Sequence, residues 1–298
     1  MAKITLLVGP PGSGKSTFAR ELIYEDGDNG LATVYINQDL QGRQEHLTLF
    51  KKAVEDGKDI IVDRMNFSKG QRNTYLDFAK SRGYSTKIVV FHVPFKTCIE
   101  RANNRKDHPT IKNSEDANRA IHYFFTHYER VQDEEADEVF RNGWVDKQST
   151  DAIWCDLDGT LSDVSNRRHH VRVEKPSKPD WKAFFENMDK DPVNEWCRDI
   201  LVTMHEKKDI VYATGRPEEY KEKTENWLIS NGLRFENSHL FMRNLRDYRK
   251  DDIVKEIILE FEVKTRYNVL FAIDDRKQVV DMLRKHGITV LQCAEGDF

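Results

Sequence analysis

A glycine-rich run near the start of the sequence places a lysine and a hydroxyl side chain at a spacing that suits phosphate binding. Residues Gly9–Thr17 read Gly-Pro-Pro-Gly-Ser-Gly-Lys-Ser-Thr and match the pattern G-x-x-x-x-G-K-[ST] between an expected strand and an expected helix. The backbone N–H groups of such a run turn toward phosphate oxygens, while Lys15 adds positive charge and Ser16 can ligate Mg²⁺. A tight turn without a ligand is the alternative, which the agreement of motif and context disfavours. The residues predicted to hold a nucleoside triphosphate are Gly9, Gly12, Ser13, Gly14, Lys15, Ser16 and Thr17.

Two aspartates at predicted strand ends are candidates for handling the group that receives the phosphate. Asp39 follows the strand expected at Thr33–Ile36, so it lies at the sheet edge of the glycine-rich run and can accept a proton from an attacking hydroxyl. Asp63 ends the strand expected at Asp59–Val62 and can orient metal-bound water or the acceptor. The alternatives are structural: Asp39 as the N-cap of a helix over Gln41–Ala53, and Asp63 as a cap or turn residue.

A pair of arginines offers positive charge to the same site. Arg101 and Arg105 stand four residues apart at the end of a helical pattern, so their guanidinium groups share one helix face. A lid of this kind can stabilise charge on a phosphoryl group during transfer. A solvated helix surface explains the same residues equally well.

The second candidate centre is a pair of aspartates directly after the apolar strand expected at Ala152–Cys155. In the run Asp156-Leu-Asp-Gly-Thr160, Asp156 is the candidate nucleophile toward phosphorus. Asp158 is the candidate acid that protonates the leaving oxygen and later activates water. We expect both carboxylates to point to one side of an extended chain and to form an oxygen-rich Mg²⁺ site. A loop that merely caps the strand is the alternative.

Three further elements follow in the order that this chemistry requires. The strand expected at Ile210–Ala213 ends in Thr214-Gly215-Arg216, whose hydroxyl and backbone amide can hold phosphate. Lys255, in a helix beginning near Asp251, can neutralise charge on the intermediate. The strand expected at Val269–Ile273 ends in Asp274 and Asp275, which suit a metal ion. Each element alone is weak evidence, and their order makes the set specific.

Strand-like apolar runs alternate with helical patterns through both halves of the chain, which predicts parallel sheets flanked by helices. The acidic and polar stretch Val131–Thr150 interrupts this pattern. We therefore predict an α/β protein of two domains, residues 1–147 and residues 148–298, each with a mainly parallel sheet. Residues 162–192, rich in Arg, His, Lys and Pro, are expected to form an insertion over the active edge of the second sheet.

The composition indicates the general class of protein but does not identify a binding partner. With 298 residues, 33% charged and 38% hydrophobic, the chain is expected to be globular and soluble. No apolar run approaches the roughly 18 residues of a membrane span, so no membrane association or export is expected. The 4 cysteines are scattered without a Cys-x-x-Cys pair and are expected to be reduced core residues in a cytoplasm. The net charge of −4 leaves nucleic acid open as a partner.

The motifs together resemble the polynucleotide kinase 3′-phosphatases of T-even bacteriophages, and the second half is similar to the haloacid dehalogenase superfamily. The resemblance runs nearly end to end and places a P-loop kinase fold before a haloacid dehalogenase-like phosphatase fold. The segments that carry it are Gly9–Thr17, Ile36–Asp39, Asp156–Thr160, Arg249–Lys255, Ala272–Arg276 and the closing Gly296–Phe298.

This resemblance implies residue roles that spacing alone does not give. Lys15 and Ser16 would bind ATP and Mg²⁺, Asp39 would activate a 5′-hydroxyl, and Arg105 with Arg101 would act from a lid. Asp156 would be the nucleophile and Asp158 the acid and base. Phosphate would be held by Arg167, Thr214, Arg216 and Lys255, and Mg²⁺ supported by Asp274 and Asp275. The residue that binds the acceptor phosphate stays open between Gln41 and Arg43.

The resemblance also implies substrates and partners. We expect phosphorylation of 5′-hydroxyl ends and removal of 3′-phosphate or 2′,3′-cyclic phosphate from RNA or DNA, with a nucleic-acid ligase as the functional partner. Self-association and location in the cytoplasm of an infected bacterium are implied in the same way. The alternatives are a small-molecule kinase fused to a small-molecule phosphatase and a nucleotide-dependent scaffold. Basic residues available for backbone phosphates are Arg101, Arg105, Lys106, Arg167, Arg168 and Arg172.

Overall fold

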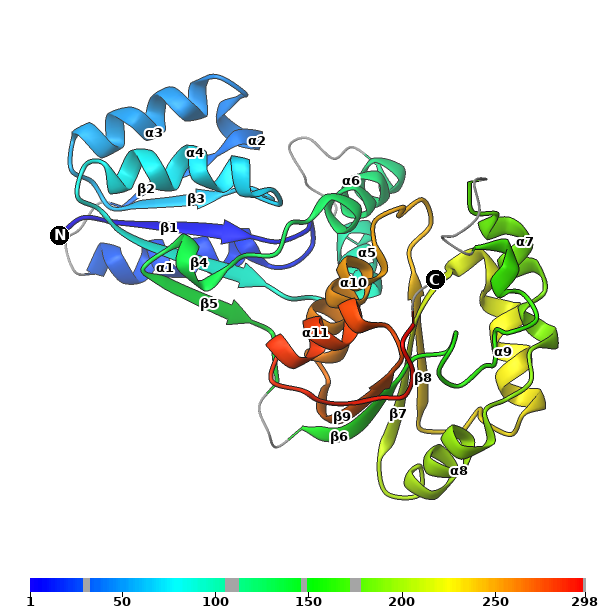
Figure 1. Cartoon of the computed structure of the whole chain (residues 1–298). Coiled ribbons are helices and arrows are strands. Elements are labelled where there is room, and N and C mark those ends of the chain that lie inside the picture. Colours follow the sequence, from blue (N-terminus) through cyan, green and yellow to red (C-terminus); the bar gives the residue numbers. More distant parts are fainter. Residues whose placement is uncertain (29–32, 105–112, 146–148, 172–177, 297–298) are drawn as a thin grey trace. The chain divides into compact units, whose positions relative to one another are not determined.

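The chain forms two compact units, Met1–Trp144 and Val145–Phe298 (Figure 1). The computed structural model describes residues 1–28, 33–104, 113–145, 149–171 and 178–296. The expected domain boundary between residues 147 and 148 lies outside the described residues. Each unit is built on its own parallel sheet, as the alternating pattern predicted.

The sheet of the first unit has 5 strands in the order β2-β3-β1-β4-β5, and every pairing is parallel. The predicted strands are confirmed to within a residue or two of their ends. β5 was not predicted, because it is an edge strand in which only two residues are apolar and none is fully buried. The strands are β1 (Lys3–Val8), β2 (Val34–Asn37), β3 (Ile60–Asp63), β4 (Ser85–Phe91) and β5 (Glu138–Asn142).

Helices cover both faces of this sheet and begin at well-defined caps. The side chain of Ser68 accepts a hydrogen bond from the N–H of Gln71, and that of Asn113 accepts one from Asp116. The helix predicted at Gln41–Ala53 is split in two around Gly42, whose φ of +92° lies in the left-handed region. The helices are α1 (Lys15–Asp28), α2 (Gln38–Gln41), α3 (Glu45–Glu55), α4 (Lys69–Lys80), α5 (Phe95–Asn103) and α6 (Ser114–His127).

A buried ion pair ties α4 to the segment after α6. The Nε atom of Arg72 donates to Glu135 Oε2 at 2.6 Å and its Nη2 atom donates to Oε1 at 2.9 Å. The same guanidinium donates to the carbonyl oxygens of Asn66, Phe67 and Glu129. Because Asn66 and Phe67 follow β3, this pair also fixes the loop at the end of that strand.

We expect Arg72→Met to destabilise the first unit by about 3–5 kcal/mol, because it leaves the buried carboxylate of Glu135 without its partner. Urea unfolding monitored by circular dichroism measures the change in the free energy of unfolding. Arg119→Ala is the matched control, since it removes only the exposed pair between Arg119 and Asp116 and should leave the transition where it is. Equal transitions for both variants would show that the buried pair is not needed.

The second sheet has 5 parallel strands in the order β10-β9-β6-β7-β8. Four of them match predicted strands. β8 was missed although it contains the apolar run Leu240–Met242; it is an edge strand, and all of its residues except Ser238 are only partly buried. The strands are β6 (Thr150–Cys155), β7 (Asp209–Pro217), β8 (Ser238–Arg243), β9 (Tyr267–Asp274) and β10 (Thr289–Gln292).

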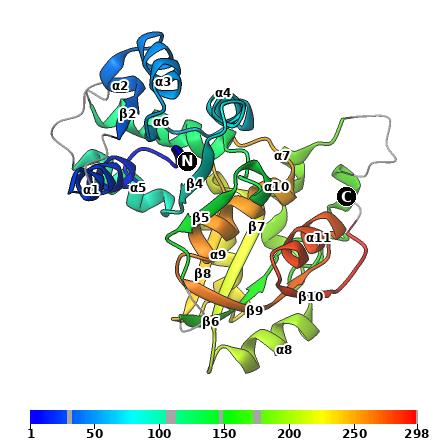
Figure 2. The ribbon, with the colours of Figure 1, turned by 90° about the vertical axis from the view of Figure 1, so that its left-hand side faces the viewer.

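Alternate residues of β6 supply two cores on opposite faces of this sheet. Ala152 and Trp154 pack with residues of α10 and α11, whereas Ile153 and Cys155 pack with residues of α8 and α9. In Figure 1, α10 and α11 lie on one side of the sheet and α8 and α9 on the other, and in Figure 2 α10 and α11 face the viewer. The helices are α7 (Trp181–Glu186), α8 (Glu195–Met204), α9 (Lys221–Ser230), α10 (Asp251–Ile257) with its π-helical extension Ile258–Val263, and α11 (Lys277–Lys285).

The segment expected to be an insertion, residues 162–192, lies between β6 and α8. Its described residues form α7 and two 3₁₀ turns, Arg168–His170 and Met188–Lys190, and add no strand to the sheet. No helix in the described part of the chain combines the length and apolar character needed to cross a membrane.

Candidate active sites

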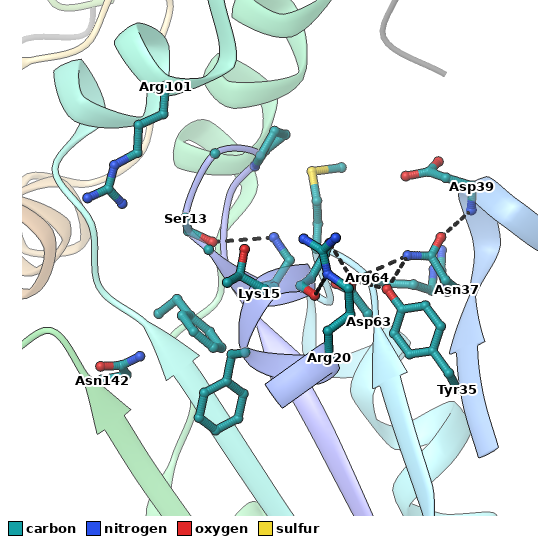
Figure 3. A pocket seen from close by; sticks show the side chains of 18 of the residues that line it. Ser13, Lys15, Arg20, Tyr35, Asn37, Asp39, Asp63, Arg64, Arg101 and Asn142 are labelled. Atoms are coloured by element: carbon teal, nitrogen blue, oxygen red, sulfur yellow. Dashed lines mark hydrogen bonds between the residues drawn. The ribbon is translucent and has the colours of Figure 1, made fainter. Parts of the chain in front are cut away.

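A pocket of about 860 Å³ opens at the carboxyl ends of the first sheet's strands (Figure 3). Parallel strands bring these ends to one edge, so residues far apart in the sequence meet there. In the view of Figure 3, Arg101 and Asp39 lie on opposite sides of Lys15. Predicted residues that line the pocket are Gly12, Ser13, Gly14, Lys15, Ser16, Thr17, Asp39, Asp63 and Arg101.

The glycine-rich run forms a compact loop around the Lys15 side chain. The Nζ atom of Lys15 donates to the carbonyl oxygens of Gly9 and Pro10, both at 2.8 Å, and to Ser13 Oγ at 3.4 Å. A Cβ atom on Gly12 would come within 2.6 Å of the Cys98 carbonyl oxygen, so a larger residue does not fit. The Lys15 ammonium is thus held against the loop itself, and the loop leads into the N-terminus of α1, a position that favours phosphate.

Ser16, the candidate metal ligand, is hydrogen-bonded to Asp63. The sequence predicted that both residues lie at this edge of the sheet, but it did not predict that they contact each other. Ser16 Oγ donates to Asp63 Oδ2 at 2.6 Å, and the hydroxyl of Tyr35 donates to the same oxygen at 2.6 Å. The amide of Asn37 donates to that oxygen at 3.2 Å. Burial and the neighbouring carboxylate raise the pKa of Tyr35 to about 12. The alternative of Asp63 as a mere cap or turn residue is wrong, since its carboxylate is buried in this network.

Asp39 lies in the first turn of α2 and its side chain is exposed at the pocket. The alternative of Asp39 as a helix N-cap is wrong. Asn37 is the cap instead, because its Oδ1 atom accepts from the N–H groups of Asp39 and Leu40 at 2.8 and 3.3 Å. Since the other amide atom of Asn37 binds Asp63, one side chain links the positions of both aspartates.

The basic residues around the pocket differ in part from those predicted. Arg101 lines it, whereas Arg105 lies outside the described residues. Arg64, which the sequence did not single out, also lines it and donates to the hydroxyl of Tyr75 at 2.8 Å. Of the two candidates for the acceptor phosphate, Gln41 uses its side chain to bond the backbone of residues 35 and 37, while Arg43 is exposed.

In the second unit, a buried acidic cluster lies at the carboxyl ends of β6 and β9. Lys255 Nζ donates to Asp156 Oδ1 at 2.6 Å and to Asp274 Oδ2 at 3.0 Å, and it lies 3.4 Å from Asp251 Oδ2. The carboxylates of Asp156, Asp274 and Asp275 approach one another within 4.8 Å. The prediction that Asp156, Lys255, Asp274 and Asp275 lie together is thus confirmed. Asp251, which the sequence analysis used only to mark the start of a helix, is a further member of this cluster.

The electrostatics of this cluster suit a cation. Burial, partly opposed by Lys255, raises the pKa of Asp156 to about 7. Burial also raises the pKa of Asp274 to about 6 and that of Asp275 to about 7, with the neighbouring carboxylates adding to the shift. One lysine does not balance this much negative charge, and carboxylate oxygens are the ligands that hard divalent cations prefer. Asp156, Asp274 and Asp275 therefore fit a divalent metal ion.

Asp158 departs from its predicted position. Its carboxylate pairs with Arg167 and with Arg216, whose Nη2 atom lies 2.6 Å away, instead of joining Asp156 in a cation site. Asp158 lies in the turn that the N–H of Thr160 closes onto the Leu157 carbonyl oxygen, and it is not among the carboxylates that gather around Asp156 in the described residues. Although burial opposes ionisation, the two guanidinium groups hold the pKa of Asp158 well below its usual range.

The two arginines predicted to hold phosphate are thus occupied by carboxylates. Arg216 is fully buried against Asp158, and Arg167 also binds Asp191 with Nε–Oδ distances of 2.8 and 3.0 Å. The guanidinium of Arg167 lies 4.0 Å from the centre of the Phe184 ring, in the insertion. The sequence did not predict a role for Asp191. It lies 24 residues after Arg167, and the segment between them has no periodic pattern that would indicate which residues meet.

Thr214 and Gly215 lie at the end of β7 next to the acidic cluster. Thr214 is fully buried and its Oγ1 atom accepts from the N–H of Arg216 at 3.2 Å. A Cβ atom on Gly215 would come within 2.1 Å of Asp251 Oδ1, so glycine permits this close approach. Arg243 donates from Nε to the Gly215 carbonyl oxygen at 2.8 Å and from Nη2 to Asp251 at 3.4 Å. It was missed because it lies on the unpredicted strand β8.

Comparison with known proteins agrees with this division of the chain. The family description "Polynucleotide kinase PNKP phosphatase domain" matches residues 150–298, and "AAA domain" matches residues 4–126. A protein of Autographa californica nuclear polyhedrosis virus, named as a bifunctional polynucleotide kinase/RNA ligase, is 25% identical over 94% of this chain and 40% of its own length. The chain therefore spans about two fifths of that relative.

Two further proteins are similar to this chain, one over about a third of its length and the other over all of it. A protein of Acanthamoeba polyphaga mimivirus, named as a bifunctional polynucleotide phosphatase/kinase, is 30% identical over 31% of this chain and 21% of its own. A chain in the solved structure of the Pnkp1/Rnl/Hen1 RNA repair complex is 25% identical, with a TM-score of 0.43 over 100% of this chain and 97% of that one. With its phosphatase domain matched over residues 150–298 and an AAA domain before it, this chain belongs to the polynucleotide kinase-phosphatase family.

Proposed function

We propose that the chain heals broken nucleic-acid ends: it phosphorylates 5′-hydroxyl ends with ATP and removes 3′-phosphate or 2′,3′-cyclic phosphate from RNA or DNA. The observation that carries this proposal is that one chain joins an Asp39-lined P-loop pocket to the Asp156 cluster of a polynucleotide phosphatase domain. The names of both viral relatives support it. A small-molecule kinase fused to a small-molecule phosphatase is less favoured, since the description of the matching family names a polynucleotide kinase.

In the kinase reaction, Asp39 accepts the proton of the 5′-hydroxyl as its oxygen bonds the γ-phosphorus of ATP. The bond from that phosphorus to the bridging oxygen breaks, and ADP leaves with the electron pair. Lys15 and Arg101 stabilise the negative charge on the transferring group. Ser16 and Asp63, which are hydrogen-bonded to each other, would hold Mg²⁺, which would supply positive charge to the phosphates of ATP.

In the phosphatase reaction, Asp156 forms a bond to phosphorus and the bond to the 3′-oxygen breaks, giving an aspartyl phosphate. Asp158 gives the leaving oxygen a proton and later accepts one from the water that hydrolyses the aspartyl phosphate. Arg167 and Arg216 hold the pKa of Asp158 low, so a phosphate group that draws a guanidinium away raises this pKa and lets Asp158 take up a proton from water, which it then donates to the leaving oxygen. Lys255 stabilises charge on the intermediate.

A divalent metal ion, for which Mg²⁺ is the proposed species, would be held by Asp156, Asp274 and Asp275. When bound, it supplies positive charge to the phosphate oxygens. The proposed functional partner is a nucleic-acid ligase, since a 5′-phosphate and a 3′-hydroxyl are the ends that ligation joins. The relative from Autographa californica nuclear polyhedrosis virus is named as both a polynucleotide kinase and an RNA ligase. Self-association and action in the cytoplasm of an infected bacterium belong to the same proposal.

The test uses an oligonucleotide with a 5′-hydroxyl and a 3′-phosphate, incubated with Mg²⁺ and γ-labelled ATP. We expect label at the 5′ end together with loss of the 3′-phosphate, and loss of both activities in excess EDTA. Inertness at both ends, with turnover of free nucleosides or small phosphate esters, would instead favour the metabolic alternative.

A further inference from the structure

The loop between β8 and α10, Asn244–Lys250, exposes an aromatic side chain beside the phosphatase site. Tyr248 is 91% exposed, more than any other large hydrophobic side chain of the described residues except Met1. Leu245, Arg246 and Lys250 of the same loop are also exposed. Because the Tyr248 side chain is almost fully exposed, it is accessible to a ligand from outside the chain.

Hydrogen bonds hold the backbone on both sides of Tyr248. The Nη1 atom of Arg243 donates to the carbonyl oxygens of Asp247 and Arg249 at 3.1 and 2.7 Å. Arg249 in turn donates to both carboxylate oxygens of Asp247, at 2.9 and 2.6 Å. The loop is thus fixed before any ligand arrives, which lowers the entropy lost when its exposed residues bind.

The same arginine anchors the loop to the segment predicted to hold phosphate. While its Nη1 atom binds the loop, the Nε atom of Arg243 donates to the Gly215 carbonyl oxygen at 2.8 Å. Gly215 lies against Asp251, which pairs with Lys255 beside the nucleophile Asp156. The loop that carries Tyr248 is therefore anchored to the end of β7 that is predicted to hold phosphate.

Two cationic side chains of the loop, Arg246 and Lys250, stand within two residues of Tyr248 and are exposed. The side chains of Arg246 and Lys250 form no hydrogen bond or ion pair with other residues in the described part of the chain. The one acidic residue of the loop, Asp247, is neutralised by Arg249. Aromatic rings flanked by cations are typical of surfaces that bind single-stranded nucleic acid, where bases stack on the ring and cations contact the backbone.

We propose that Tyr248 is a stacking platform for a base near the 3′ end of a single-stranded substrate, with Arg246 and Lys250 contacting its backbone. This inference rests on the proposed phosphatase function and adds a substrate-binding residue to it. The ring acts on binding alone, so it contributes to KM and leaves the chemical step to the buried cluster. A small phosphate ester that occupies only the phosphate site gains nothing from it.

The experiment compares a single-stranded 3′-phosphorylated oligonucleotide with p-nitrophenyl phosphate for the full chain and its variants. We expect Tyr248→Ala to raise KM for the oligonucleotide by roughly tenfold or more, with kcat and the hydrolysis of p-nitrophenyl phosphate unchanged. Tyr248→Phe should retain the wild-type KM, because it keeps the ring. Tyr24→Ala is the matched control, since Tyr24 is 75% exposed and lies in the other unit.

The outcomes separate the two proposals. If the wild-type chain removes the oligonucleotide's 3′-phosphate and Tyr248→Ala does so with the same KM, the stacking inference is overturned and the proposed function stands. An equal loss on both substrates would mean that the loop only shapes the site, which also overturns stacking. A wild-type chain that hydrolyses p-nitrophenyl phosphate but no 3′-phosphorylated oligonucleotide would overturn the proposed phosphatase function and the inference together.

Discussion

Replacing Asp156 with asparagine is expected to lower 3′-phosphate removal by on the order of 10⁴-fold or more while leaving 5′ phosphorylation within about twofold of wild type. The amide cannot form the bond to phosphorus on which the proposed mechanism depends. The fold should tolerate the change, because Lys255 keeps Asp274 and Asp251 as partners and the substitution removes a charge from a cluster with too many carboxylates. Loss of 3′-phosphate and gain of 5′ label on one oligonucleotide measure both activities.

Asp199→Asn serves as the matched control, because this aspartate lies exposed on α8 and should not affect either activity. Thermal unfolding of both variants checks that the sites are intact. Retention of phosphatase activity by Asp156→Asn would rule out this residue as the nucleophile. Loss of both activities in a folded variant would show that the two centres are not independent.

Replacing Asp39 with asparagine has the opposite expected result: 5′ phosphorylation falls by about 10²–10⁴-fold and 3′-phosphate removal does not change. Asparagine cannot take the proton of the attacking hydroxyl at neutral pH. The structural effect should be small, since the side chain of Asp39 is exposed and Asn37 supplies the cap of α2. Initial rates of label transfer at saturating ATP measure the loss.

The control for this variant is Asp56→Asn, another exposed aspartate of the first unit, at the end of α3. An intact kinase rate in Asp39→Asn would require a different base. Asp63 also lines the pocket, but its Oδ2 atom already accepts hydrogen bonds from Ser16, Tyr35 and Asn37. A role in binding the metal therefore suits it better than a role as base.

The sequence by itself determined the two parallel-sheet units and the set of residues that gather at their active edges. Central strands such as β1 and β6 are buried on both faces, so they appear in the sequence as continuous apolar runs. The chain direction of parallel strands then brings the residues after them to one edge, as happens for Asp156 and Asp274. The edge strands β5 and β8, most of whose residues are only partly buried or exposed, were missed.

The tertiary structure alone decided which charged group pairs with which. Spacing placed Asp158 beside Asp156, but its carboxylate pairs with Arg167 and Arg216, so a predicted metal ligand is held as a counter-ion of two arginines. Likewise, no local pattern predicts that Asn37 caps α2 while binding Asp63. Ion pairs and hydrogen bonds depend on distances between atoms that the chain brings together only on folding, and residue order carries no direct record of those distances.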